Sequence, residues 1–205
     1  LLFRCISWKN ESYDGVDSKE GICTWHGTVP FWNLSCRIPI SVSSTKGYSE
    51  EEAIQYYIDK LLKLFDEEAP ASDVAAIIIE PLQGEGGFIP APIEFVKKLR
   101  KICDDNGIML IADEVQCGNC RTGKYFTSEY WKEAGAAPDI NCHSESLMGA
   151  GVPISAISAR EEVMDAALAG TIGGTYCGNP LACAAAIKRW ASVRCLYEDR
   201  RMWLA

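Results

Sequence analysis

Several features that mark common classes of protein are missing from this chain. No stretch approaches the ~20 consecutive apolar residues that a membrane-spanning helix requires, so we expect no membrane partner. Basic residues are not in excess, because the formal net charge is -8, whereas nonspecific nucleic-acid binding depends on a basic surface. The sequence also shows no secretory pattern of basic start, apolar centre and small-residue cleavage site, and we expect a cytoplasmic location.

Histidine is scarce, which limits the metal chemistry open to the chain. There are two histidines, His26 and His143, beside ten cysteines of irregular spacing. Cys117 and Cys120 have the CxxC spacing of half a zinc site or of a redox pair, but no second CxxC follows. Several other cysteines lie inside apolar runs, as buried free thiols do. We therefore expect no metal site, and we expect His143 to be an exposed or hydrogen-bonded loop residue.

The chain does contain enough apolar sequence for a folded core. Apolar residues make up 48% of its 205 residues, which argues against disorder. No internal repeat or low-complexity tract interrupts it. Residues 1–48 nevertheless carry little periodic signal, since their tryptophans are scattered among polar residues, glycine and cysteine. We predict no particular element for that segment.

A helix is predicted after this first segment. Ser49 and Glu52 have the spacing of a capping box, in which each residue satisfies a backbone N–H group of the other. Apolar residues at helical spacing follow as far as Phe65. The helix should end near Glu68, because Pro70 cannot continue it.

A strand–helix–strand unit follows. The continuous apolar run Val74–Ile79 predicts a strand buried on both faces, and residues 108–112 predict another. Between them, apolar residues over 95–103 predict an amphipathic helix with Gly107 as its C-cap. This order is typical of the βαβ unit of a parallel sheet.

Both predicted strands end in acidic residues. Glu80 follows the first strand, and Asp113 and Glu114 follow the second. Open α/β sheets bind ligands outside the carboxyl ends of their strands, and a carboxylate there needs a cation or a strong donor. The sequence therefore indicates a ligand site at this edge. The alternative is that Asp113 only caps the turn that follows it.

The C-terminal half has weaker signals. We predict a helix across Tyr125–Glu133, a short strand over Ile154–Ser158 and a helix over Glu161–Leu168. Asn179 followed by Pro180 resembles a helix N-cap with proline in the first turn, which predicts that an alanine-rich helix begins there.

Four short segments, taken in their order and spacing, carry a family resemblance. They are Glu80–Gly87, Asp113–Gln116, Arg121–Lys124 and Gly173–Pro180. Together they resemble the class III (ω-amino acid) pyridoxal-phosphate-dependent aminotransferases, most strongly over residues 74–186. The resemblance implies an α/β fold with the three-layer, mostly parallel sheet of the fold type I large domain, present here in incomplete form.

The same resemblance implies a division of the chain and a reaction. Residues 1–48 form a poorly assigned segment, 49–190 a partial cofactor-binding large domain, and 191–205 a helical tail. The cofactor implied is pyridoxal 5'-phosphate, and the reaction moves an amino group from 4-aminobutyrate or a related ω-amino acid to a keto acid. Glu80 and Glu85 are similar to acids that flank the substrate pocket. The family pattern also implies a homodimer with shared sites.

Four positions match residues that contact the cofactor in the family. By resemblance, Asp113 keeps the pyridine ring nitrogen protonated, which the cofactor needs as an electron sink. Val115 would pack against the ring, and Gln116 would hydrogen-bond the ring hydroxyl. Thr175 matches a threonine that reaches the cofactor phosphate of the neighbouring subunit.

The main departure from the family is a missing lysine. Pro138–Ile140 matches a family motif that leads to the lysine of the Schiff base, but Glu145 stands at that position. No lysine occurs between Lys132 and Lys188, so a register shift does not supply one. That lysine acts as covalent tether and as proton-transfer base. We therefore expect Glu145 to be non-functional at the catalytic position, with no covalent cofactor attachment and no turnover.

Other readings of the sequence stay open. The chain could be a non-catalytic pseudoenzyme, or an interaction fragment that pairs with a full-length aminotransferase. A small thiol or zinc protein built on Cys117 and Cys120 is the least favoured function. Cys120 also stands where the family has glycine, which matters if the position needs a positive φ. Arg121 and Lys124 are expected to order their loop rather than bind substrate.

Overall fold

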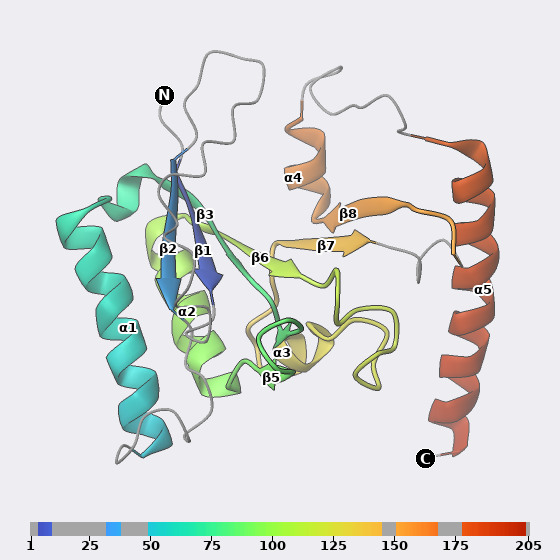
Figure 1. Ribbon diagram of the computed structural model, residues 1–205, viewed down its shortest axis with the longest axis horizontal. Helices are drawn as coiled ribbons and strands as arrows, with labels where there is room; N and C mark the ends of the chain where they lie inside the picture. Colours follow the sequence, from blue (N-terminus) through green and yellow to red (C-terminus); the bar gives the residue numbers. More distant parts are fainter. Residues whose placement is uncertain (1–3, 10–31, 38–48, 145–150, 168–177, 204–205) are drawn as a thin grey trace.

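The computed structural model describes residues 4–9, 32–37, 49–144, 151–167 and 178–203 (Figure 1). A six-stranded sheet in the order β2-β1-β3-β6-β7-β8 forms its centre. All neighbouring strands run parallel except β7 and β8, which are antiparallel. The strands are β1 (Arg4–Lys9), β2 (Trp32–Arg37), β3 (Val74–Ile79), β6 (Met109–Asp113), β7 (Ile140–Ser144) and β8 (Ser155–Ala159). The predicted α/β class with a mostly parallel sheet is confirmed.

The first helix forms as its sequence predicts. Helix α1 spans Glu50–Glu67 and begins at a complete capping box. The Ser49 backbone N–H donates to the Glu52 carboxylate at 2.7 Å, and the Glu52 N–H donates to the Ser49 hydroxyl at 3.3 Å. One face of the helix is apolar and is buried in the core; its buried residues are Ala53, Ile54, Tyr57, Ile58, Leu61 and Phe65.

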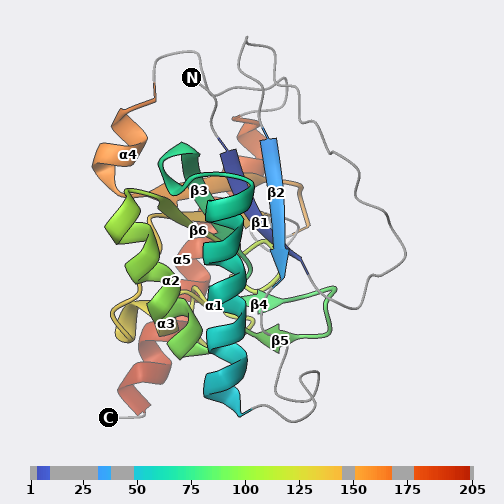
Figure 2. The same cartoon turned by 90° about the vertical axis from the view of Figure 1, so that its left-hand side faces the viewer.

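The strand–helix–strand unit is also confirmed. Helix α2 (Ile93–Asn106) connects β3 to β6, and these two strands are parallel neighbours with Ile79 opposite Ala112. Gly107 ends α2 with φ +67°, a left-handed conformation that a residue without Cβ adopts at little cost. Figures 1 and 2 place α1 and α2 on one side of the sheet and α5 on the other.

Only one face of the central strands is fully buried. Ile77, Leu110 and Ala112 are each 0% exposed and belong to the cluster that α1 and α2 cover. Ile78 and Ile111 point to the opposite face and are half-buried. The sequence predicted burial on both faces, so that prediction holds in full for one face only.

The two ends of the chain extend this unit. Strands β1 and β2, whose segment gave no periodic signal, add to the sheet beside β3. Helix α5 (Pro180–Trp203) begins at the predicted N-cap, since the Asn179 side chain accepts the backbone N–H of Leu181 at 3.0 Å and of Ala182 at 3.3 Å. The domain boundaries at residues 48 and 190 stay a prediction. No helix in the part of the chain described here is both long and apolar enough to span a membrane.

The predicted helix that ends at Glu133 is shorter than expected. Helix α3 spans only Glu129–Glu133. The two residues before it, Thr127 and Ser128, donate their backbone N–H groups to the Glu114 carboxylate at 2.6 and 3.0 Å. The Glu114 side chain, just after β6, thus satisfies two donors that precede the first turn of α3 and have no acceptor within that helix.

Strand β7 was not predicted, and it changes the place of His143. This residue is in β7 rather than in a loop, and it is 6% exposed. Its Nε2 lies 2.7 Å from the Ser158 hydroxyl on β8, and its ring stacks on Phe126 with centroids 4.6 Å apart. The expectation of a loop residue is therefore wrong, although His143 is hydrogen-bonded. Helix α4 (Glu161–Asp165) follows β8.

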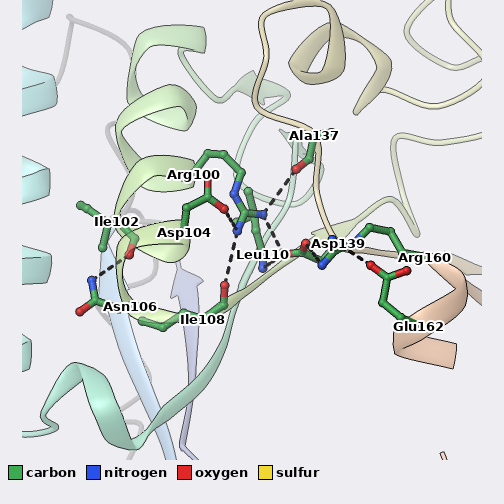
Figure 3. Close-up of polar contacts among 10 residues, drawn as sticks. All are labelled: Arg100, Ile102, Asp104, Asn106, Ile108, Leu110, Ala137, Asp139, Arg160 and Glu162. Carbon is green, nitrogen blue, oxygen red and sulfur yellow. Dashed lines mark hydrogen bonds and ion pairs between the residues drawn. The ribbon is translucent and has the colours of Figure 1, made fainter. Parts of the chain in front are cut away.

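Asp139 joins three parts of the fold at one carboxylate (Figure 3). It accepts the Leu110 backbone N–H at 2.8 Å, pairs with Arg100 of α2 at 2.7 Å and with Arg160 at 3.0 Å. The Asp139 side chain is 10% exposed, so three donors compensate for the loss of its hydration. The contacts fix the beginning of β6, helix α2 and the segment between β8 and α4 relative to one another.

The remaining described elements are short. Strands β4 (Leu82–Gln83) and β5 (Ile89–Pro90) form an antiparallel pair, and the 3₁₀ turn Ala71–Asp73 precedes β3. The β4–β5 pair carries the glycine-rich loop that follows Glu80, so this loop folds back on itself beside the sheet edge.

Candidate functional site

The acidic residues predicted to mark a site lie together at the carboxyl edge of the sheet. Ile79 of β3 is opposite Ala112 of β6, so the next residues along each strand, Glu80 and Asp113, follow in the same register. The charge of Asp113 acts on the Glu80 carboxyl, which confirms that the two groups are near one another. Two carboxyl groups from adjacent strands therefore face one region of the edge.

Asp113 is the last residue of β6 and is half-buried. Its Oδ1 accepts the Val115 backbone N–H at 3.1 Å, so it caps the turn as the simpler reading of the sequence proposed. Its Oδ2 accepts no hydrogen bond from the described residues. Capping the turn and binding a ligand are thus compatible, because they use different oxygens.

Glu80 is held differently. Its Oε2 accepts the Gly84 backbone N–H at 2.9 Å, which closes the beginning of the glycine-rich loop. Burial raises the pKa of the Glu80 carboxyl, the Gly84 hydrogen bond opposes that effect, and the charge of Asp113 adds to it. A cation placed between Glu80 and Asp113 would offset both the burial of the Glu80 carboxylate and its repulsion by Asp113.

Gln116 closes this edge against the glycine-rich loop. A Cβ built on Gly84 would lie 3.0 Å from the Gln116 Cγ, tighter than an ordinary contact, so the Gln116 side chain packs directly on this glycine. Val115 is half-buried in the same turn, whereas Glu85 is exposed at the loop surface. The structure therefore brings Glu80, Asp113 and Gln116 together, and Glu85 lies at the exposed side of this group, since its charge also raises the pKa of Glu80. Glu145 and Thr175 lie outside the described residues.

The sequence did not reveal what Glu114 does. This residue is 0% exposed, and its carboxylate anchors the loop before α3 through Thr127 and Ser128. Burial raises the pKa of the Glu114 carboxyl, and the hydrogen bonds from Ser128 and Thr127 oppose that effect. Gly118 also packs on Glu114, since a Cβ there would meet the Glu114 carbonyl oxygen at 2.8 Å. No local sequence signal links residues that lie thirteen or fourteen positions apart.

The loop that follows Gln116 is ordered by contacts within itself. Cys120 has φ +70°, so this position does require the left-handed conformation for which glycine is suited. Lys124 pairs with Glu133 and lies over the Tyr130 ring, 4.2 Å from its centroid. The prediction that Lys124 orders its loop is confirmed.

The CxxC pair does not have the properties of a reactive dithiol. Cys117 is 1% exposed, and burial raises the pKa of its thiol to about 11. A thiol of this kind is protonated at neutral pH and is a poor nucleophile and metal ligand. Neither cysteine forms a disulfide with another described residue, and the described residues contain no group of three or more His, Cys, Asp or Glu side chains that could hold a metal ion.

Comparison with known proteins identifies the family. The profile of the class-III aminotransferase family matches residues 18–196, and the chain belongs to this family. It is 47% identical over 145 residues to the 5-aminovalerate aminotransferase of Pseudomonas putida, covering 71% of this chain and 32% of that protein. It is also 47% identical over 142 residues to the 4-aminobutyrate aminotransferase of Escherichia coli, covering 69% of this chain and 32% of that protein.

Solved structures agree with this assignment. An amine transaminase from an uncultivated Pseudomonas species, in its PLP-bound (internal aldimine) form, superimposes with a TM-score of 0.72 at 27% identity, over 94% of this chain and 46% of that one. An (S)-enantioselective omega-transaminase from Thermomicrobium roseum has a TM-score of 0.71 at 27% identity, over 87% of this chain and 39% of that one. The chain thus spans about a third of the length of the curated relatives above.

Proposed function

We propose that this chain binds pyridoxal phosphate without a covalent bond, at the sheet edge formed by Glu80, Asp113 and Gln116. The observation that carries the proposal is the Asp113 carboxylate, half-buried at the end of a parallel strand with one oxygen left for a ligand. A carboxylate in that environment matches the charge of a protonated pyridine ring. The family membership of the chain supports the same cofactor.

The neighbouring residues fit this group as well. The aliphatic part of the exposed Gln116 side chain packs against Gly84, which places the residue at this edge. Val115 offers an apolar side chain in the same turn. Bound here, the cofactor would supply an electron sink for reactions at an amino acid carbon. Asp113 would hold the ring proton, and Gln116 would hydrogen-bond the ring hydroxyl.

We further propose that this chain does not complete a transamination. Glu145 replaces the lysine that the family uses both as tether and as base. A carboxylate does not form an imine, and it adds negative charge near a phosphate. In an intact relative the reaction would move the amino group of 4-aminobutyrate, 5-aminovalerate or a similar ω-amino acid to a keto acid. The chain would belong to the cytoplasm and to the homodimer that the family pattern implies, with Thr175 directed to the neighbouring cofactor phosphate.

The proposal is tested by separating binding from covalent attachment. Pyridoxal phosphate should bind the purified chain reversibly, measured by absorbance titration, and borohydride treatment should leave no adduct on the peptide of residues 138–153. Binding should be lost in Asp113→Ala and kept in Glu67→Gln, because Glu67 is an exposed residue of α1 whose carboxylate pairs with Lys63. Glu145→Lys should create a trapped adduct on that peptide.

Two results would overturn it. An adduct on residues 138–153 of the unaltered chain would contradict the absence of covalent attachment. Equal affinity of the unaltered chain and Asp113→Ala would remove Asp113 from the site.

A second candidate function is an interaction fragment. The chain keeps the Asp113 edge, and one face of its central strands is only half-buried. These observations favour a non-catalytic pseudoenzyme that pairs with a full-length aminotransferase. Co-purification with such a relative, measured by size-exclusion chromatography with light scattering, should give a defined stoichiometry. A monodisperse monomer in the presence of the relative would rule this candidate out.

A further inference from the structure

The strand beside Asp113 brings a thiol to the same edge. Cys142 of β7 is the register partner of Asp113 of β6. Paired residues of neighbouring strands project to the same face of a sheet, so the Cys142 and Asp113 side chains lie on one face. The Glu114 backbone N–H donates to the Cys142 carbonyl at 3.0 Å, which fixes this part of the strand pair.

The surroundings of Cys142 differ from those of the other described thiols near the sheet. Cys142 is half-buried and free, whereas Cys103 and Cys117 are 0% and 1% exposed. Burial, and then the charge of Asp113, raise the pKa of the Cys142 thiol, so it stays protonated at neutral pH. A protonated thiol is a small, polarisable, uncharged surface, which suits the edge of an aromatic ring.

We propose that Cys142 forms a wall of the ring site, beside Asp113 and opposite Glu80, and is covered when a phosphorylated hydroxypyridine binds. This inference rests on the proposed function, because it assumes that such a ring lies against Asp113. It adds a contact residue to the site, and it assigns Cys142 no part in bond making or breaking.

Protection from alkylation tests the contact directly. Pyridoxamine 5'-phosphate is the probe, since it has an amine in place of the aldehyde and does not react with thiols. The whole chain is treated with iodoacetamide with and without the probe, and the modification of each cysteine is followed by peptide mass spectrometry. At about ten times the dissociation constant, the free fraction falls about tenfold, and the alkylation rate of Cys142 should fall by the same factor.

Two internal comparisons make this result specific. Cys183 on α5 is free and partly exposed, and its alkylation rate should not change. In Asp113→Asn the protection of Cys142 should disappear at the same probe concentration. Probe binding is measured in the same samples by fluorescence.

The outcomes separate the two proposals. If the probe binds but Cys142 reacts at its original rate, Cys142 is not a wall of the site, and the proposed function stands. If the probe does not bind, the proposed function fails, and this inference fails with it.

A pair of substitutions provides an independent check. Cys142→Ser keeps the size of the side chain, and it should bind the probe within about twofold of the unaltered chain. Cys142→Met adds two heavy atoms at the wall and should weaken binding about tenfold or more, as overpacking of about 1–3 kcal/mol predicts. Circular dichroism confirms that both variants are folded. Equal affinities of the two folded variants would contradict the contact.

Discussion

Asp113 and Glu114 are adjacent acids at the end of one strand, and their surroundings give them different tasks. Asp113 is half-buried and keeps an oxygen for a ligand, whereas Glu114 is 0% exposed and accepts two backbone N–H groups from the loop before α3. Glu114 follows the last residue of β6, and its side chain is directed to the backbone of Thr127 and Ser128, whereas Asp113 accepts only the Val115 N–H among the described residues. The two adjacent carboxylates therefore have different partners.

The first prediction concerns Glu114. Glu114→Ala removes the acceptor of two buried N–H groups, and each unsatisfied group costs about 1–3 kcal/mol, so we expect a loss near 3 kcal/mol in the free energy of unfolding. Urea denaturation measures it. Glu67→Ala removes an exposed partner of Lys63 and should cost less than about 0.5 kcal/mol. Equal losses in the two variants would contradict the structural role of Glu114.

A second prediction at the residue scale is the pH dependence of His143. Burial lowers the pKa of its imidazole below 6.5, so the unfolded chain binds more protons than the folded chain in the window beneath 6.5. The contribution of neutral His143 to the free energy of unfolding is fully present above that window. This contribution is lost as the pH falls through the window. His143→Phe keeps a ring against Phe126 and should make the free energy of unfolding less dependent on pH between about 7.5 and 5.5. His26 is present in both proteins and cancels, so identical slopes would contradict the prediction.

Elements of the fold differ in how far their sequences predict them. The capping box of Ser49 and Glu52, the C-cap at Gly107 and the N-cap at Asn179 are local signals, and each helix end was predicted correctly. Strand β7 was missed because its sequence is mostly polar, with Asn141 and His143 on one face. The short α3 depends on Glu114, a residue distant in sequence, and no local pattern encodes such a contact.

The same distinction holds for the site. Glu80 and Asp113 could be placed at one edge because each follows or ends a strand that the sequence predicts. The register of the two strands then makes the two residues neighbours. The contact of Gln116 with Gly84 and the neighbour relation of Asp113 and Cys142 depend on how loops and strands meet in space. Sequence position alone does not give those contacts.

A prediction at the element scale concerns the loop after β6. Cys120 holds φ +70°, and a left-handed residue with a Cβ costs about 1–2 kcal/mol. Cys120→Gly should therefore stabilise the chain by up to about 1 kcal/mol, part of the gain being offset by the greater freedom of glycine in the unfolded chain. Cys120→Ala keeps the strain while removing the thiol, and it should not stabilise. Thermal unfolding of the two variants distinguishes these outcomes. A lower unfolding temperature for Cys120→Gly would contradict the proposed backbone strain at Cys120.

The Asp139 network allows a further comparison of elements. The Arg100 side chain is 11% exposed and the Arg160 side chain 54%, although both pair with Asp139. Removing a buried partner costs about 3–5 kcal/mol, whereas an exposed partner contributes about 0–1 kcal/mol. Arg100→Ala should therefore destabilise the chain several-fold more than Arg160→Ala in urea unfolding. Equal losses in the free energy of unfolding of the two variants would contradict the expectation that the more buried arginine contributes more.

At the scale of the whole molecule, the chain corresponds to part of the length of its family relatives. It belongs to the class-III aminotransferases but spans about a third of the curated relatives it matches. One face of β3 and β6 is buried in the core with α1 and α2, and their opposite face is half-buried. This arrangement keeps the strand ends that lead to Glu80 and Asp113 at one edge of the sheet.

The state of the ring nitrogen tests the central claim most directly. Pyridoxamine phosphate labelled with ¹⁵N in the ring, bound to the chain near pH 8, should resonate as a protonated pyridinium, because Asp113 stabilises the positive charge through a charge-assisted hydrogen bond. In Asp113→Asn, which binds the probe more weakly and is therefore studied at a probe concentration high enough to saturate it, the bound label should shift to the position of a neutral pyridine. A neutral resonance in the unaltered chain, or no difference between the two proteins, would contradict the account.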